Sequence, residues 1–312
     1  MLKQTHLFLI VQRGFMFALA GIALCLSGCM RQETQSDPSR MRLVSTAPNL
    51  TESLYAIGAG DLLVGRTDVC DYPPEQVKNV PVTGGFATPW LEPLLAVRPT
   101  HLVETILADP ESENRLKRLS ISVVHVPILG LADIPGSLLQ LGELTGHTTE
   151  ATDLATTIRA GLHAAELESR ALTEHPRVLL LFAPDTPITA GRHAFVSELL
   201  ELAGGINVGR ESQSDYYQVS LEWLIRQNPD VILCLFDTYA HDPCALFEQQ
   251  IGWKALTAVR QHRVYALPDL NTVSRPGPRV LDGLAQLKHL LARDAREHGR
   301  APVKPGRLEP KE

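Results

Sequence analysis

Two segments of this chain place a glutamate and, seven residues later, a proline in the same setting. One segment covers residues 91–103 and the other covers residues 221–233. In each, the glutamate begins a short amphipathic helix, where the helix dipole favours a carboxylate, and the proline ends that helix before a buried strand. Taken alone, Glu92 and Glu222 are each explained by capping of the helix that they begin. A matched pair, one in each half of the chain, predicts two similar acidic projections.

The sequence contains few of the motifs that are typical of catalysis. The sequence has no G-x-S-x-G elbow, no Walker glycine-lysine loop and no G-x-G-x-x-G dinucleotide turn. Its eleven histidines include no pair at the i, i+4 spacing typical of metal ligands on one helix. We therefore predict neither an enzyme cofactor nor a metal site. An enzyme on a Rossmann-like fold stays a remote alternative, because fold alone does not decide function.

The chain begins with a targeting segment. A charged region carrying Lys3 and Arg13 precedes an apolar stretch over residues 15–26, and small residues then lead to Cys29. This pattern is typical of a secretory signal, and about 12 apolar residues are too few to cross a bilayer. The sequence around Cys29 resembles the lipobox of bacterial lipoproteins. That resemblance implies a signal peptide over residues 1–28, cleavage before Cys29, a diacylglycerol on its thiol, and a mature protein that is anchored to the membrane without spanning it.

Composition limits the remaining possibilities. The formal net charge of -6 argues against nucleic acid as a partner, because phosphate binding needs a concentration of Lys and Arg. Of the five cysteines, only three fall in the folded part, too few for a disulfide scaffold. In an oxidising compartment Cys234 and Cys244 are a plausible disulfide pair, with Cys70 left over. Buried free thiols at these positions are an equal alternative.

Short apolar runs alternate with longer helical patterns, which predicts an α/β fold. We expect strands at residues 43–45, 62–65, 101–104, 122–126, 178–182, 231–236 and 264–267. Between the first two strands we expect a short helix over residues 50–57, with Asn49 as its N-cap, Glu52 completing a capping box and Gly58 ending it.

A long helix is predicted in the middle of the chain, because residues 148–174 contain no proline and carry apolar side chains at helical spacing. A pair of helices broken near Gly161 is the alternative. The expected divisions are a tether over residues 29–41, an N-terminal α/β lobe over 42–146, the linking helix over 147–175, a C-terminal α/β lobe over 176–296 and a disordered tail over 297–312.

Over most of its length the chain resembles the periplasmic binding proteins of the helical-backbone type, which are the siderophore, haem and vitamin B12 receptors of ABC importers. The resemblance rests on residues 42–52, 64–65, 71–74, 84–86, 92–103, 199–207, 222–233, 253–265 and 275–280, in this order. It implies two Rossmann-like lobes joined by one long helix, a ligand cleft between the lobes, and a small hinge motion. It also implies that Glu92 and Glu222 dock on arginines of the permease.

Within the family the resemblance is strongest to the vitamin B12-binding branch, which the run Asp-Tyr-Pro-Pro at 71–74 favours. It implies a ligand that is cobalamin or a related corrinoid. The ligand-binding positions implied by the match are Pro48, Asn49, Tyr72, Phe86, Tyr216 and Arg275.

The sequence departs from the vitamin B12 pattern at two positions that bear on the identity of the ligand. Tyr216 stands where a tryptophan is expected, and Asn271 stands where an aspartate is expected. A ferric siderophore is therefore the alternative ligand. Haem comes third, with Tyr72 or Tyr216 as a possible axial ligand of its iron.

The implied partners are an ABC permease with its ATPase, a small-molecule metal chelate, and a membrane held through the lipid anchor. We expect an extracytoplasmic monomer.

Overall fold

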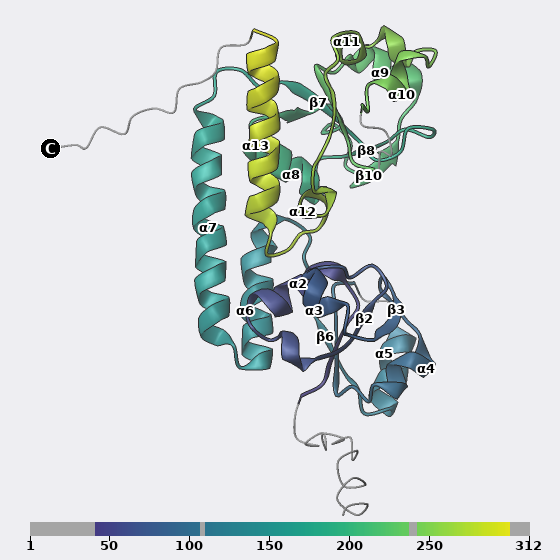
Figure 1. Ribbon diagram of the computed structural model, residues 1–312, viewed down its shortest axis with the longest axis vertical. Helices are drawn as coiled ribbons and strands as arrows, with labels where there is room; N and C mark the ends of the chain where they lie inside the picture. Colours follow the sequence, from purple (N-terminus) through teal and green to yellow (C-terminus); the bar gives the residue numbers. More distant parts are fainter. Residues whose placement is uncertain (1–40, 107–109, 237–241, 300–312) are drawn as a thin grey trace, which may run out of the picture. The chain divides into compact units, whose positions relative to one another are not determined.

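The computed structural model of this protein describes residues 41–106, 110–236 and 242–299. Figure 1 shows its helices and strands. The predicted signal segment, Cys29, nearly all of the tether and nearly all of the tail lie outside the described residues.

The N-terminal lobe, residues 41–146, is built on one six-stranded sheet in the order β4-β3-β2-β1-β5-β6. All neighbouring strands are parallel except β3 and β4. Its strands are β1 (Leu43–Ser45), β2 (Leu63–Thr67), β3 (Val82–Gly85), β4 (Thr88–Pro89), β5 (His101–Glu104) and β6 (Ser122–His125). Its helices are α2 (Pro48–Ala56), α3 (Pro74–Val77), α4 (Leu91–Ala96), α5 (Pro110–Arg118) and α6 (Ile134–Thr145).

The C-terminal lobe, residues 171–299, has a parallel four-stranded sheet in the order β12-β11-β7-β9 and a separate antiparallel pair, β8 with β10. Its strands are β7 (Arg177–Leu181), β8 (Ile188–Ala190), β9 (Ile206–Asn207), β10 (Tyr216–Gln218), β11 (Val231–Cys234) and β12 (Val264–Ala266). Its helices are α8 (Phe195–Leu202), α9 (Leu221–Gln227), α10 (Ala245–Glu248), α11 (Thr257–Arg260), α12 (Leu270–Ser274) and α13 (Val280–Glu297).

The two lobes are joined by one continuous helix, α7 (Thr148–Arg170), of 23 residues and roughly 35 Å. It runs through Gly161 without a break. A Cβ atom at Gly161 would lie 2.7 Å from a methyl carbon of Leu281, so a larger residue here would require the Leu281 side chain to shift; α7 and α13 run side by side in Figure 1. The predicted architecture of two Rossmann-like lobes joined by a long helix is confirmed.

A single buried hydrophobic cluster reaches from one lobe into the other. It includes Leu54 of α2, Leu141 of α6, Ile158 of α7, Leu199 of α8 and Leu287 of α13, all with almost no exposed surface. Because a close-packed core resists deformation, this continuous cluster stiffens the connection between the lobes.

The start of α2 differs from the prediction. Pro48 takes the first helical position, which its fixed φ favours, so the N-cap is Ala47 and no side chain caps the helix. The capping box is therefore wrong: Asn49 lies inside the helix, and Glu52 is too far along it to reach the N-cap N–H. The expected end is confirmed, since Gly58 follows the C-cap with a φ of 83°.

Candidate functional site

A cavity of about 370 Å³ lies at the carboxyl ends of the strands of the N-terminal lobe. Its lining residues from this lobe each follow a strand: Pro48 and Asn49 follow β1, Phe86 follows β3, Thr105 and Ile106 follow β5, and Ile128 and Leu129 follow β6. β1 and β5 are neighbours where the strand order reverses. Ligands bind at such switch points in open α/β sheets, so the topology itself places a crevice here.

The opposite wall of the cavity comes from the C-terminal lobe. It is formed by residues at the start of α8, at β10 and at the end of α12, namely His193, Ala194, Phe195, Asp215, Tyr216, Ser274, Arg275 and Pro276. The cavity therefore lies between the two lobes. A cleft of this volume is within the range of small-molecule sites.

Apolar side chains with exposed surface gather at this cavity. Phe86 is 52% exposed, Ile106 54%, Leu129 81% and Tyr216 51%. Soluble proteins rarely leave large apolar side chains grouped at the surface without a binding role. Polar atoms of Asn49, Thr105, His193 and Arg275 lie among them, so the lining combines apolar area with a few polar groups.

The structure brings five of the six predicted ligand-binding residues to the cavity: Pro48, Asn49, Phe86, Tyr216 and Arg275. Tyr72 is not among the lining residues. Its ring lies under the guanidinium of Arg279, with Cζ 4.0 Å from the ring centroid. This cation–π contact covers one face of the ring, and Tyr72 is 40% exposed, so its contact with a ligand stays a prediction.

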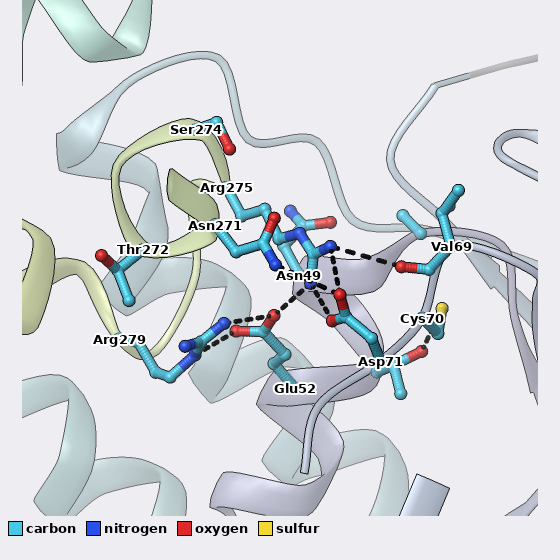
Figure 2. A network of polar contacts seen from close by, with 12 residues as sticks. Asn49, Glu52, Val69, Cys70, Asp71, Asn271, Thr272, Ser274, Arg275 and Arg279 are labelled. Atoms are coloured by element: carbon cyan, nitrogen blue, oxygen red, sulfur yellow. Dashed lines mark hydrogen bonds and ion pairs between the residues drawn. The ribbon is translucent and has the colours of Figure 1, made fainter. Parts of the chain in front are cut away.

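Arg275 is also part of an ion cluster that ties the two lobes together, shown in Figure 2. We call this the inter-lobe ion cluster; its members are Glu52, Asp71, Asp269, Arg275 and Arg279. Glu52 lies at its centre, with 2% of its side chain exposed, and accepts hydrogen bonds from Nη1 of Arg275 at 2.9 Å and from Nε and Nη2 of Arg279 at 2.8 and 2.9 Å. Arg279 also donates to Asp269 at 2.8 Å.

At the outer edge of the cluster, Asp71 accepts two hydrogen bonds from Arg275 and one from Nδ2 of Asn271, the latter at 3.1 Å. Burial raises the pKa of the Asp71 carboxyl, but the hydrogen bond and charge of Arg275 outweigh it, so the pKa is lowered. Asn49 adds a contact in which its Nδ2 donates to the carbonyl of Pro276 at 3.0 Å. Arg275 thus has two carboxylate partners in the same place where it lines the cavity.

The two predicted docking residues occupy equivalent positions. Glu92 is in the first turn of α4 and Glu222 in the first turn of α9, and both are exposed. The ten-residue segments 91–100 and 221–230 share their burial pattern at every position except the first. A hydrogen bond from its own backbone N–H and one from the Ser220 hydroxyl lower the pKa of Glu222, so this carboxylate is ionised at neutral pH.

The three cysteines of the folded part are buried free thiols. The pairing of Cys234 with Cys244 is not formed in the structure and stays a prediction. The two are close enough for the charge of Cys244 to contribute to the pKa of Cys234, which burial first and Cys244 second raise to about 12.

Sequence reasoning missed several residues of the site. Arg279 and Asp269 belong to the ion cluster, and His193, Ile106 and Leu129 line the cavity. Arg279 lies within the stretch that carries the family resemblance, and this was the one sequence signal for it. The others follow strands or precede helices and carry no sequence mark of their own.

The fold and this cleft define an α/β binding protein with two lobes, a long connecting helix and its ligand site between the lobes. Comparison with known proteins identifies the family to which the chain belongs. The family model described as periplasmic binding protein matches residues 43–270, and the chain belongs to this family. This is a family of extracytoplasmic transport components and not one of enzymes. No helix in the described part of the chain is both long and apolar enough to span a membrane.

Relatives agree with the family. A vitamin B12-binding protein of Pectobacterium atrosepticum is 29% identical over 283 residues, covering 89% of this chain and 95% of its own. An uncharacterized ABC transporter substrate-binding lipoprotein of Bacillus subtilis, YvrC, is 29% identical over 254 residues, covering 79% and 78%. Among solved structures, the periplasmic haem-binding protein RhuT of Roseiflexus sp. RS-1 has a TM-score of 0.70 at 27% identity, covering 82% of this chain and 99% of its own. The vitamin B12-binding protein BtuF of Vibrio cholerae has a TM-score of 0.68 at 25% identity, covering 82% and 98%.

Proposed function

We propose that this protein is the lipid-anchored substrate-binding component of an ABC importer, and that it captures cobalamin or a related corrinoid in the cleft between its lobes. The observation that carries the proposal is the group of exposed apolar side chains, Phe86, Ile106, Leu129 and Tyr216, at one inter-lobe cavity. A corrin is a large, mostly apolar disc with amide arms. Apolar walls would supply buried area for such a ligand, and the few polar groups would fix its orientation.

The charges around the cavity favour a ligand with neutral arms. Arg275, the cationic side chain among the described lining residues, already pairs with Glu52 and Asp71. Asp215 adds a negative charge to the lining. A ligand that presents carboxylates would meet this charge and would have to compete for Arg275, whereas the amides of a corrinoid would not.

Haem is the second candidate, because two possible axial ligands, His193 and Tyr216, line the same cavity. Burial first and the charge of Asp215 second raise the pKa of Tyr216, which opposes the tyrosinate that iron would need. His193 is the better candidate ligand; its Nε2 lies 3.0 Å from Oε1 of Gln213, an interaction that iron would have to replace. A ferric siderophore remains a third possibility within the family.

The test is isothermal titration of residues 41–312 with cyanocobalamin, with hemin and a ferric siderophore in parallel. One-to-one binding of cyanocobalamin, with recovery of the chelate unchanged, would support the proposal and exclude turnover. No binding signal with cyanocobalamin, together with binding of hemin, would establish haem as the ligand. His193→Ala should then remove hemin binding, while His163→Ala, which changes an exposed histidine on α7, should leave both hemin and cyanocobalamin binding unchanged.

We further propose that Glu92 and Glu222 dock the loaded protein on arginines of the permease, whose ATPase drives uptake. Both are exposed carboxylates in matching surroundings, one in each lobe. Exposed charge pairs steer association and set its register more than they supply affinity. Cys29, through its lipid, would keep the protein at the membrane as a monomer near its importer.

A further inference from the structure

Three side chains with different metal-binding chemistry meet on the C-terminal lobe. Cys244 is the N-cap of α10, Glu248 is the last residue of the same helix, and His262 lies in the turn between α11 and β12. Their sulfur, oxygen and nitrogen atoms all lie within 4.8 Å of one another. None of the three lines the inter-lobe cavity or belongs to the docking helices.

The distances approach those of a metal centre. In a tetrahedral zinc site, bonds of about 2.3 Å to sulfur and about 2.0–2.1 Å to nitrogen and oxygen place two ligand atoms roughly 3.3–3.6 Å apart. Nδ1 of His262 is 3.3 Å from Oε1 of Glu248, which already meets this spacing. The side chains of His262 and Glu248 are 71% and 38% exposed, so they can rotate to bring the remaining distances inward.

The surroundings of the thiol favour a cation. Cys244 is 2% exposed, and its Sγ donates a weak hydrogen bond to the carbonyl of Val259 at 3.4 Å. Asp242 lies beside it, accepting the N–H of Cys244 at 2.8 Å. The negative charges of carboxylates beside the thiol favour the binding of a divalent cation at the same place.

We propose that Cys244, Glu248 and His262 form a site for one Zn²⁺ ion, with a fourth position open to water. A thiolate, an imidazole and a carboxylate are the ligand types that zinc takes in proteins. On binding, the S–H bond of Cys244 breaks, its proton passes to water and an S–Zn bond forms, without any change of oxidation state. His262 binds as the neutral imidazole through Nδ1. The spacing of histidines could not reveal this site, because it contains one histidine and its other two ligands belong to a different helix, α10.

The site and the predicted disulfide exclude each other. A bond between Cys234 and Cys244 would remove the thiolate, so only the reduced protein can hold the ion. A Cys234→Ser variant keeps Cys244 free in every condition and separates the two possibilities.

The test is titration of the full chain, reduced and in detergent, with Co²⁺ alone as a spectroscopic substitute for zinc. We expect one equivalent to produce a thiolate-to-cobalt charge-transfer band that Zn²⁺ removes. Cys244→Ser should abolish the band, and His262→Ala and Glu248→Gln should each weaken binding at least tenfold. Cys234→Ser should keep the band, and oxidation of the unmodified chain should remove it.

Two matched controls use residues of similar chemistry elsewhere. Cys70→Ser changes another buried thiol, and His163→Ala changes an exposed histidine whose Nδ1 lies 3.8 Å from Glu166 on α7. Both should bind Co²⁺ within twofold of the unmodified chain. Absence of the band in the reduced chain, or its persistence in Cys244→Ser, would overturn the proposal. Because His262 is exposed, unchanged affinity in His262→Ala would overturn it too, whatever the fold of the cysteine variants.

Discussion

Replacing Glu52 with glutamine should strongly destabilise the folded unit. The carboxylate is 98% removed from solvent and accepts three hydrogen bonds from two guanidinium groups, whose side chains are 15% and 13% exposed. Glutamine keeps the size of the side chain and removes the charge. Breaking a buried ion pair by removing one partner costs about 3–5 kcal/mol, because it leaves a buried charge uncompensated. Arg279 would lose two of its three hydrogen bonds to carboxylates, and Arg275 would lose one of its three.

The loss can be measured as the free energy of unfolding of residues 41–312 in urea and as the melting temperature. For a unit of this size, about 2–4 °C per kcal/mol gives a decrease of about 6–20 °C. Glu166→Gln is the matched control: this carboxylate pairs with Arg170 on the surface of α7, and its loss should cost less than about 0.5 kcal/mol.

A second variant tests the cause. Adding Arg275→Gln to Glu52→Gln removes one of the two stranded guanidinium groups, so the double variant should lose less than the sum of the single losses. A cost below about 1 kcal/mol for Glu52→Gln alone would refute the reasoning. It would mean that Asp71 and Asp269 suffice to hold the two arginines, and that Glu52 contributes little to the contact between the lobes.

Three further predictions concern charges elsewhere. Replacing both Glu92 and Glu222 with alanine should abolish uptake in cells while leaving ligand affinity in titration unchanged; a loss of affinity would show a structural role. Because the pKa of Asp71 is lowered in the folded state, its contacts stabilise the fold above its ordinary pKa of about 4 and are lost as the pH falls through the lower folded value. Amide exchange in residues 270–274 should rise over that interval, and Asp71→Asn should show no such step. Asp294→Ala should cost about 3–5 kcal/mol in urea unfolding, since it strands the buried guanidinium of Arg263, whose two hydrogen bonds to Asp294 measure 2.8 and 2.6 Å; a cost near zero would contradict the buried pair.

The parts of the fold that the sequence predicted well are those set by local pattern. The strands β1 and β5 have the expected bounds, because short apolar runs between turn residues are typical of buried strands in an α/β domain. The paired helices α4 and α9 follow from a glutamate at one end and a proline beyond the other. The long helix was predicted from its apolar spacing.

What the sequence did not predict depends on contacts between distant residues. Glu52 was expected to cap its own helix, whereas its partner Arg279 is 227 residues away. A buried acid in a helical pattern looks the same whether it caps a helix or pairs with an arginine of another lobe. Tyr72 was assigned to the cleft by resemblance alone, and the sequence did not reveal that Arg279 lies over its ring. His262 and Cys244 come together because α10 and α11 pack in one lobe, which spacing along the chain does not reveal.

The cleft and the contact between the lobes share residues, and this affects how a ligand is selected. Asn49 and Arg275 line the cavity and also connect α2 with the segment after α12. A ligand that drew Arg275 into the cavity would have to offset its hydrogen bonds to Asp71 and Glu52. With a hydrophobic core that is continuous through both lobes, wide closure around the ligand would also disrupt packing. Selectivity should therefore come from the fit of a largely preformed cavity, with the ordering cost of binding kept low. A rigid, flat chelate with neutral arms meets both conditions better than a flexible anionic one.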